Sequence, residues 1–182
     1  MLEKIITSKS KTFLVFCFCF LAGIALTSVL NKKIDFVYSS DLIRAISTAE
    51  EILHFHPSLN LVLTEEIRER CYGIYDGKHR DIYTTAARKE KVSYHAFKPE
   101  GGESIIEAKE RARKFYSKLK EKHSSDTVLL VTHGGFIRAL MAAILNESLK
   151  NGKYCNVRQL NTAVTIFNNG KLEIFNSTKH LE

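Results

Sequence analysis

Proline is scarce in this chain, with only two prolines among 182 residues, and neither an internal repeat nor a low-complexity stretch interrupts it. Without a linker to divide it, a chain of this length predicts one domain that is large enough to bury a core. Hydrophobic residues make up 45% and charged residues 26% of the sequence. These are ordinary values for a globular protein and argue against disorder.

Cysteine is also scarce, and its spacing excludes two classes of protein. The four cysteines are Cys17, Cys19, Cys71 and Cys155. They form neither the paired spacing of a zinc site nor a disulfide framework, so we expect reduced thiols in an intracellular, cytoplasmic protein. His54 and His56 stand close together, but no further cluster of ligands accompanies them. No metal and no cofactor is therefore predicted.

Acidic residues are too few to balance the basic ones. Lys and Arg number 27 against 20 Asp and Glu, which leaves a net charge of +7. This balance favours an anionic ligand. The basic residues are scattered along the chain rather than gathered in one stripe, so a small phosphorylated molecule is a better candidate than nucleic acid.

Short apolar strands alternate with amphipathic helices over most of the chain. The predicted elements are strands at 34–40, 59–63 and 127–132 and helices at 42–55 and 105–119. Ser40 or Asp41 is expected to cap the first helix. Residues 163–177 resemble a hairpin with an Asn-Gly turn. This order predicts an α/β fold, a three-layer α/β/α arrangement with a mostly parallel sheet and a C-terminal hairpin.

Two of these strands end in residues that could bind an anion. One ends at Ser40 and the other runs into His133, which two glycines follow. In a parallel sheet both ends open on the same edge, where α/β proteins keep their ligand sites. Arg44 stands one turn into the helix after Ser40. We therefore expect Arg44 and His133 to converge on an anion near helix N-termini.

Four segments in this order and spacing resemble the histidine phosphatase superfamily, with its phosphoglycerate mutase-like fold. They are "VYSSDLIRA" (37–45), "IRERCYGIYDGK" (67–78), "FKPEGGES" (97–104) and "LLVTHGG" (129–135). The resemblance covers roughly residues 22–178. The loops are similar to those of fructose-2,6-bisphosphatase-type phosphatases and of cofactor-dependent phosphoglycerate mutases. The chain is shorter than typical mutases, which favours a phosphatase.

The resemblance implies a phosphohistidine mechanism. A histidine attacks phosphorus, cations hold the phosphoryl oxygens, and a carboxylic acid protonates the departing alkoxide and then activates water. Arg44 matches a phosphate-binding arginine, Glu69 matches the proton donor, and His133 matches the second histidine that stabilises the phosphoryl group. The Gly134 backbone amide would add a contact to the phosphate.

The same resemblance places three residues around the substrate pocket. Glu103 and Ser104 match the segment that borders the pocket. Asp76 stands where the family commonly carries glutamate, and this change is expected to alter substrate preference rather than chemistry.

One motif of the family is missing from this sequence. The family begins with a strand that ends in Arg-His-Gly and supplies the nucleophile, but no Arg-His-Gly occurs here, and His54 is the first histidine. The segment "KTFLVFCFCF" (11–20) has the character of a first strand, with Phe16-Cys17-Phe18 where Arg-His-Gly would stand. We therefore expect the family's first strand to be lost or replaced. Neither Cys17 nor Cys19 has the glycines and arginine that activate a cysteine nucleophile.

The apolar run that contains this segment, residues 13–30, is near the lower limit for a membrane-spanning helix. Its second half also resembles the family's first helix, which weakens a membrane interpretation. We predict an atypical apolar segment at 1–21 and an N-terminally incomplete phosphatase domain at 22–182.

Three accounts of this N-terminus stay open. The chain is an incomplete or frame-shifted reading of a longer gene, a pseudophosphatase that binds phosphorylated ligands, or a degenerate domain anchored to a membrane through residues 13–30. The first is favoured, because the rest of the site is intact. The predicted function is hydrolysis of a small phosphomonoester such as a sugar phosphate, impaired by the missing nucleophile. The sequence does not distinguish a phosphatase from a mutase, and it does not predict the oligomeric state.

Overall fold

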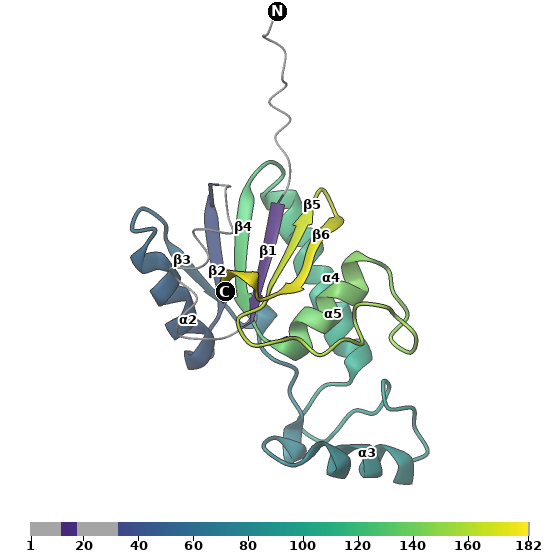
Figure 1. Cartoon of the computed structure of the whole chain (residues 1–182). Coiled ribbons are helices and arrows are strands. Elements are labelled where there is room, and N and C mark those ends of the chain that lie inside the picture. The colour runs from purple at the N-terminus through teal and green to yellow at the C-terminus, as the bar shows by residue number, and fades with distance from the viewer. Residues whose placement is uncertain (1–11, 18–32, 182) are drawn as a thin grey trace, which may run out of the picture.

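A computed structural model describes residues 12–17 and 33–181, and these form one mixed sheet with helices on both faces (Figure 1). The strands are β1 (Thr12–Cys17), β2 (Phe36–Ser40), β3 (Leu61–Thr64), β4 (Thr127–Thr132), β5 (Val164–Asn168) and β6 (Lys171–Ser177). The α-helices are α2 (Ile43–His54), α3 (Arg80–Lys89), α4 (Ile105–Lys122) and α5 (Gly134–Ile144). Short 3-10 helices lie at Glu65–Ile67 (η1), Gly73–Tyr75 (η2) and Lys179–Leu181 (η3).

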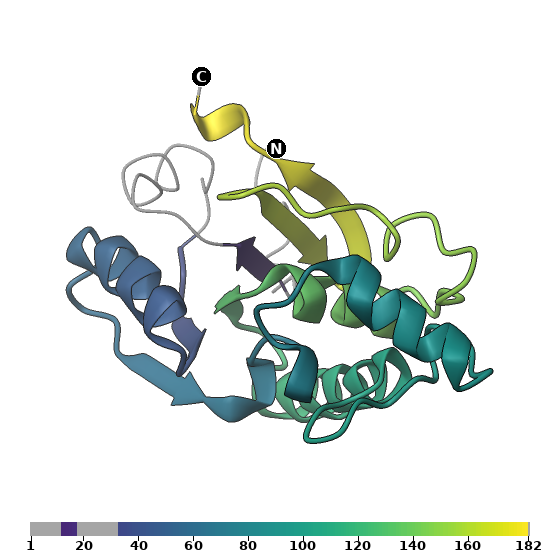
Figure 2. The ribbon, with the colours of Figure 1, turned by 90° about the horizontal axis from the view of Figure 1, so that it is seen from below.

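The strand order is β3-β2-β4-β1-β5-β6. The first four strands in this order run parallel, whereas β5 pairs antiparallel with β1 and β6 pairs antiparallel with β5. Helix α2 covers one face of the sheet, and α4 and α5 cover the other (Figure 2). The predicted α/β fold with its C-terminal hairpin is confirmed.

The side chains of β4 point alternately to the two faces of the sheet, and this explains why the strand lies in the middle of the sheet. All six of its residues are buried. Leu129 and Val131 pack with α2 on one face, whereas Val128 and Leu130 pack with α4 and α5 on the other. A strand that is buried on both faces must be apolar throughout, and such strands are typical of parallel sheets under helices.

The apolar N-terminal segment supplies the first strand. Strand β1 lies between β4 and β5, with the backbone of Cys17 opposite Thr132. From the sequence we expected the family's first strand to be lost or replaced, and the structure shows a strand, formed by the apolar segment, between β4 and β5. The residues after Cys17, including most of the 13–30 run, lie outside the described residues. No helix in the described part is long and apolar enough to cross a membrane.

The chain between η1 and α4 forms a separate small cluster, the α3 lobe (residues 71–103), which lies beyond the end of the sheet in Figure 1. Its core is aromatic: Tyr83 and Phe97 are buried, with ring centroids 5.0 Å apart, and Tyr72 and Tyr75 pack against them. Helix α3 was not predicted from the sequence. The buried residues of the lobe pack against one another and form a cluster separate from the core that covers the sheet.

One predicted cap is wrong. Helix α2 begins after Leu42, which makes no side-chain capping bond. The side chains that we expected to cap it are engaged elsewhere. Ser40 Oγ accepts the Leu42 N–H at 3.3 Å and contacts a histidine, and Asp41 pairs with Arg68.

Candidate active site

His133 stands where β4 ends and α5 begins, and its side chain is only 4% exposed. Arg44 Nε donates to His133 Nδ1 at 3.1 Å, and His133 Nε2 lies 2.8 Å from Ser40 Oγ. A guanidinium only donates, so Nδ1 must be the acceptor, and in the neutral imidazole the proton lies on Nε2 and is donated to Ser40. The predicted convergence of Arg44 and His133 at the sheet edge is therefore present in the structure.

The surroundings of His133 hold its ring neutral. Burial, together with the positive charges of Arg44 and Arg111, lowers the pKa of His133 from 6.5 to about 4, although the Asp41 carboxylate acts in the opposite direction. A neutral imidazole can donate a hydrogen bond from Nε2 to a phosphoryl oxygen in place of Ser40 Oγ, while the exposed Arg44 supplies the positive charge. The pair is thus equipped to bind an anion without a metal.

The carboxylate of Glu69 lies against the first turn of α5, close to this pair. Its Oε1 accepts the Arg70 N–H at 2.8 Å, and its Oε2 accepts the Gly135 N–H at 3.2 Å. The helix N-terminus favours a negative charge there. Gly135 is required for this approach, because a Cβ on it would lie 2.2 Å from Glu69 Oε1. Each carboxylate oxygen keeps a second lone pair that is able to hold a proton.

Three hydrogen bonds from two side chains, Thr132 and Arg111, hold the loop that carries Glu69. Thr132 Oγ1 donates to Ile67 O at 2.5 Å. Arg111 donates to the carbonyl oxygens of Glu66 and Arg68 at 2.9 and 3.0 Å. Arg111 was not singled out from the sequence, since an arginine on an amphipathic helix is usually a solvated charge. Its role depends on carbonyl groups that a sequence pattern does not show.

The two predicted pocket-rim residues have structural contacts. Glu103 forms an ion pair with Arg111 and accepts the Cys71 N–H at 3.4 Å. Ser104 is buried and caps α4, in a capping box in which its hydroxyl accepts the Glu107 N–H and the Glu107 carboxylate accepts the Ser104 N–H. A contact of these residues with substrate stays a prediction, as does the predicted contact of the Gly134 amide.

Two acidic residues at the mouth of the site also have partners. Asp41 forms an ion pair with Arg68, and the bond from Arg68 lowers the pKa of Asp41. This pair joins the turn before α2 to the loop before Glu69. Asp76 accepts the Tyr72 N–H at 3.0 Å within the α3 lobe. In the part of the chain that the structure describes, no group of three or more His, Cys, Asp or Glu side chains is placed to hold a metal ion.

The sequence of the chain matches a known protein family. The profile of the histidine phosphatase superfamily (branch 1) matches residues 23–175. The chain belongs to this superfamily. Phosphoglycerate mutase-like protein 4 of Arabidopsis thaliana is 30% identical over 165 residues, which cover 84% of this chain and 68% of that protein.

Solved structures of other histidine phosphatases show the same fold. A phosphoserine phosphatase mutant of Entamoeba histolytica in complex with phosphoserine has a TM-score of 0.75 at 21% identity, covering 94% of this chain and 100% of that one. A mycobacterial glucosyl-3-phosphoglycerate phosphatase with inorganic phosphate has a TM-score of 0.70 at 22% identity, covering 95% of this chain and 99% of that one.

The predicted absence of the superfamily's nucleophile concerns the end of β1 and stays a prediction. Strand β1 ends at Cys17, which pairs with Thr132 of β4. The end of β1 therefore lies one residue short of the level of His133. The prediction that Phe16-Cys17-Phe18 stand where other members carry Arg-His-Gly stays a prediction, since residues 18–32 lie outside the described residues.

Proposed function

We propose that this histidine phosphatase acts on small phosphomonoesters, such as sugar phosphates, and that the sequence lacks the nucleophile for full turnover. The observation that carries this proposal is the group formed by Arg44, His133 and Glu69. A cation and a neutral N–H donor lie at one edge of the sheet, and a carboxyl group rests on the helix N-terminus beside them.

Each of these groups has a defined part in the transfer. Arg44 and His133 bind the phosphoryl oxygens and offset the negative charge that develops on them. Glu69 gives its proton to the ester oxygen as the P–O bond breaks and the electron pair moves to that oxygen. Where a histidine has accepted the phosphoryl group, water then attacks phosphorus, the P–N bond breaks, and Glu69 takes a proton from that water. The first acceptor of the phosphoryl group, a histidine in other members, is the missing part.

The alternative function is binding without turnover. It is supported by the same Arg44 and His133 pair, which is able to hold a phosphate whether or not a nucleophile is present. We place either function in the cytoplasm, with tethering to a membrane through residues 13–30 as the alternative. Sedimentation of the full chain with lipid vesicles that resists high salt would favour tethering.

The first experiment measures binding and turnover separately. Calorimetry with inorganic phosphate reports binding, and p-nitrophenyl phosphate with a panel of sugar phosphates reports hydrolysis. We expect saturable phosphate binding and a turnover on the order of 10³ or more below that of an intact relative. No phosphate binding by the folded chain would contradict both functions, and full turnover would contradict the missing nucleophile.

Restoring the motif tests the second half of the proposal. Two variants place Arg-His-Gly at the end of β1, Phe16→Arg/Cys17→His/Phe18→Gly and Cys17→Arg/Phe18→His/Cys19→Gly, because the register leaves both positions open. We expect one of them to raise turnover by at least about 100-fold. The same variant carrying His133→Ala is the matched control and should lose the gain. If neither folded variant gains activity, the missing motif is not what limits turnover.

A further inference from the structure

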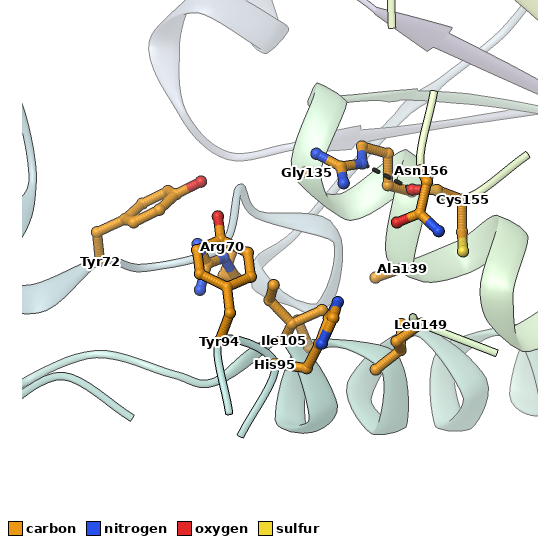
Figure 3. Close-up of a pocket in the computed structure, with 12 residues that line it drawn as sticks. Arg70, Tyr72, Tyr94, His95, Ile105, Gly135, Ala139, Leu149, Cys155 and Asn156 are labelled. Carbon is orange, nitrogen blue, oxygen red and sulfur yellow. Dashed lines mark hydrogen bonds between the residues drawn. The ribbon is translucent and has the colours of Figure 1, made fainter. Parts of the chain in front are cut away.

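A pocket opens beside Gly135, between the α3 lobe, α4 and α5 (Figure 3). Ile105, Ala108, Ala139 and Leu149 provide apolar lining, whereas Arg70 and Arg138 provide two guanidinium groups. Among the residues that line it there is no aspartate and no glutamate. The pocket therefore combines a short apolar surface with an excess of positive charge.

Arg70 is the more deeply buried of the two cations, with 5% of its surface exposed. Its guanidinium carbon lies 3.9 Å from the ring centre of Tyr72, and its NH1 donates to Tyr83 Oη at 2.8 Å. Within the described residues no carboxylate pairs with it. A charge buried without a counter-ion is costly to the fold. Such a group is expected where a ligand provides the opposite charge.

Arg138 lies one turn along α5 from Gly135. Its Nε donates to Cys155 O at 2.7 Å, which fixes the side chain, and no ion pair with a carboxylate is formed in the described part of the chain. The nearby Glu147 carboxylate is occupied with the backbone N–H groups of Tyr154 and Cys155. It therefore stabilises the loop that carries Cys155 rather than pairing with Arg138.

The position of this pocket relates it to the proposed reaction. Gly135 lines the pocket and also holds the Glu69 carboxylate. Arg70 follows Glu69 directly in the chain. Because Glu69 protonates the ester oxygen, the rest of the leaving group continues from Glu69 away from the Arg44 and His133 pair. The pocket is thus where the alcohol part of a phosphomonoester would lie.

Resting on the proposed function, we infer that the preferred ligand is a phosphomonoester whose alcohol part carries a second anionic group, a carboxylate or a phosphate. Arg70 and Arg138 bind this group, and the short carbon skeleton packs on Ile105 and Ala139. A neutral alcohol would leave both guanidinium groups without a counter-charge. The inference assigns to these two arginines the selection of the leaving group.

Paired ligands separate this inference from the proposed function. O-phosphoserine and O-phosphoethanolamine differ by one carboxylate, and 3-phosphoglycerate and glycerol 3-phosphate form a second pair without an amine. A bisphosphorylated diol beside its monophosphate tests a phosphate as the second group. Dissociation constants are measured by calorimetry on the full chain. We expect at least one dianionic partner to bind about tenfold or more tightly than its counterpart, as charged hydrogen bonds provide.

Variants of the chain test whether the preference for a ligand with a second anionic group depends on this pocket. Arg138→Gln should reduce the ratio of the two dissociation constants to about threefold or less, whereas Arg138→Lys should keep part of it because the charge is retained. Arg113→Gln is the matched control, since Arg113 is exposed on α4 and pairs with Glu110. Circular dichroism checks the folding of every variant, and Arg70→Gln is added if it folds.

The outcomes are distinct. If both members of every pair bind equally well to the wild-type chain, the inference is overturned and the proposed function stands. If neither member of any pair binds, the proposed function falls and the inference with it. A preference that survives in folded Arg138→Gln would overturn the assignment to this pocket.

Discussion

The two halves of the candidate site are built in different ways. The phosphoryl half (Ser40, Arg44 and His133) is carried by the ends of β2 and β4 and the first turn of α2. The leaving-group half (Glu69, Arg70, Arg138 and the pocket between them) joins a loop, the α3 lobe and α5. The regular sheet thus positions the general chemistry of phosphate binding, whereas segments that are free to differ position the part that selects a ligand.

Gly135 is where the two halves meet, and its substitution is expected to have the largest effect. Gly135→Ala places a Cβ 2.2 Å from Glu69 Oε1, so the carboxylate must move away from the helix N-terminus. Because the clash is with the end of a flexible side chain and alanine favours a helix more than glycine, we expect stability to change by less than about 1 kcal/mol, measured by urea unfolding. Any hydrolysis of p-nitrophenyl phosphate should fall by at least about tenfold.

The neighbouring glycine provides the matched control. A Cβ on Gly134 would lie 3.7 Å from Gln159 Cβ, which is an ordinary contact. Gly134→Ala does not displace Glu69 and should therefore reduce hydrolysis far less than Gly135→Ala. Equal losses in the two variants would mean that helix α5, rather than the contact with Glu69, requires glycine.

Arg44→Ala tests the phosphoryl half alone. Removing the cation that donates to His133 should weaken the binding of inorganic phosphate by about tenfold or more, because a charged hydrogen bond to the anion is lost. Calorimetry measures the change. Arg138→Gln should weaken the binding of inorganic phosphate much less, since inorganic phosphate has no leaving group. A larger effect of Arg138→Gln would show that the two halves are not separate.

Thr132→Val tests how firmly the loop of Glu69 is fastened to β4. The substitution keeps the shape of a buried side chain but removes the hydroxyl that donates to Ile67 O. We expect a loss of about 1 kcal/mol, since one buried carbonyl loses its partner. Thermal unfolding measures it, with Thr85→Val on the exposed surface of α3 as the control. Equal melting temperatures of the two variants would contradict a stabilising role of the hydrogen bond between Thr132 and Ile67 O.

The pH dependence of stability reports on His133 and is expected to be the smallest effect near neutral pH. The pKa of His133 is about 4 in the folded chain, against the ordinary histidine value of 6.5 that applies once the chain unfolds. Between these values the unfolded chain binds more protons, so stability falls as pH decreases from 6.5 toward 4 and is unaffected by this group above 6.5. His133→Gln should remove this part of the dependence when melting temperatures at about pH 7.5 and about pH 5.5 are compared. An unchanged dependence would mean that His133 is protonated in the folded chain.

Much of the phosphoryl half could be predicted from residues alone. His133 follows an apolar strand and precedes two glycines, and Arg44 stands a fixed distance after a second strand end, so the geometry of parallel strands brings them together. The α3 lobe could not be predicted in this way. Helix α3 is short and mostly polar, and its buried residues Tyr83 and Ala87 pack on Phe97 and other residues of the lobe rather than on the sheet.

The cap of α2 was predicted wrongly for a related reason. Ser40 and Asp41 have the composition of a capping site, but His133 and Arg68 compete for their side chains. Both competitors are distant in the sequence, so a local pattern does not show them. Glu103 is a comparable case, because its partner Arg111 is reached only through the packing of α4.

The sequence by itself determined the layered fold through local periodicity and the family through motifs of adjacent residues. The meeting of Arg44 and His133 followed from the order of the parallel strands, and Glu69 was assigned through the resemblance. Only the tertiary structure decided that β1 completes the sheet, that Glu69 rests on Gly135, and that Arg70 and Arg138 line one pocket without a carboxylate. These facts depend on which distant segments pack together and on how closely, and close approach is a property of three-dimensional contact rather than of spacing along the chain.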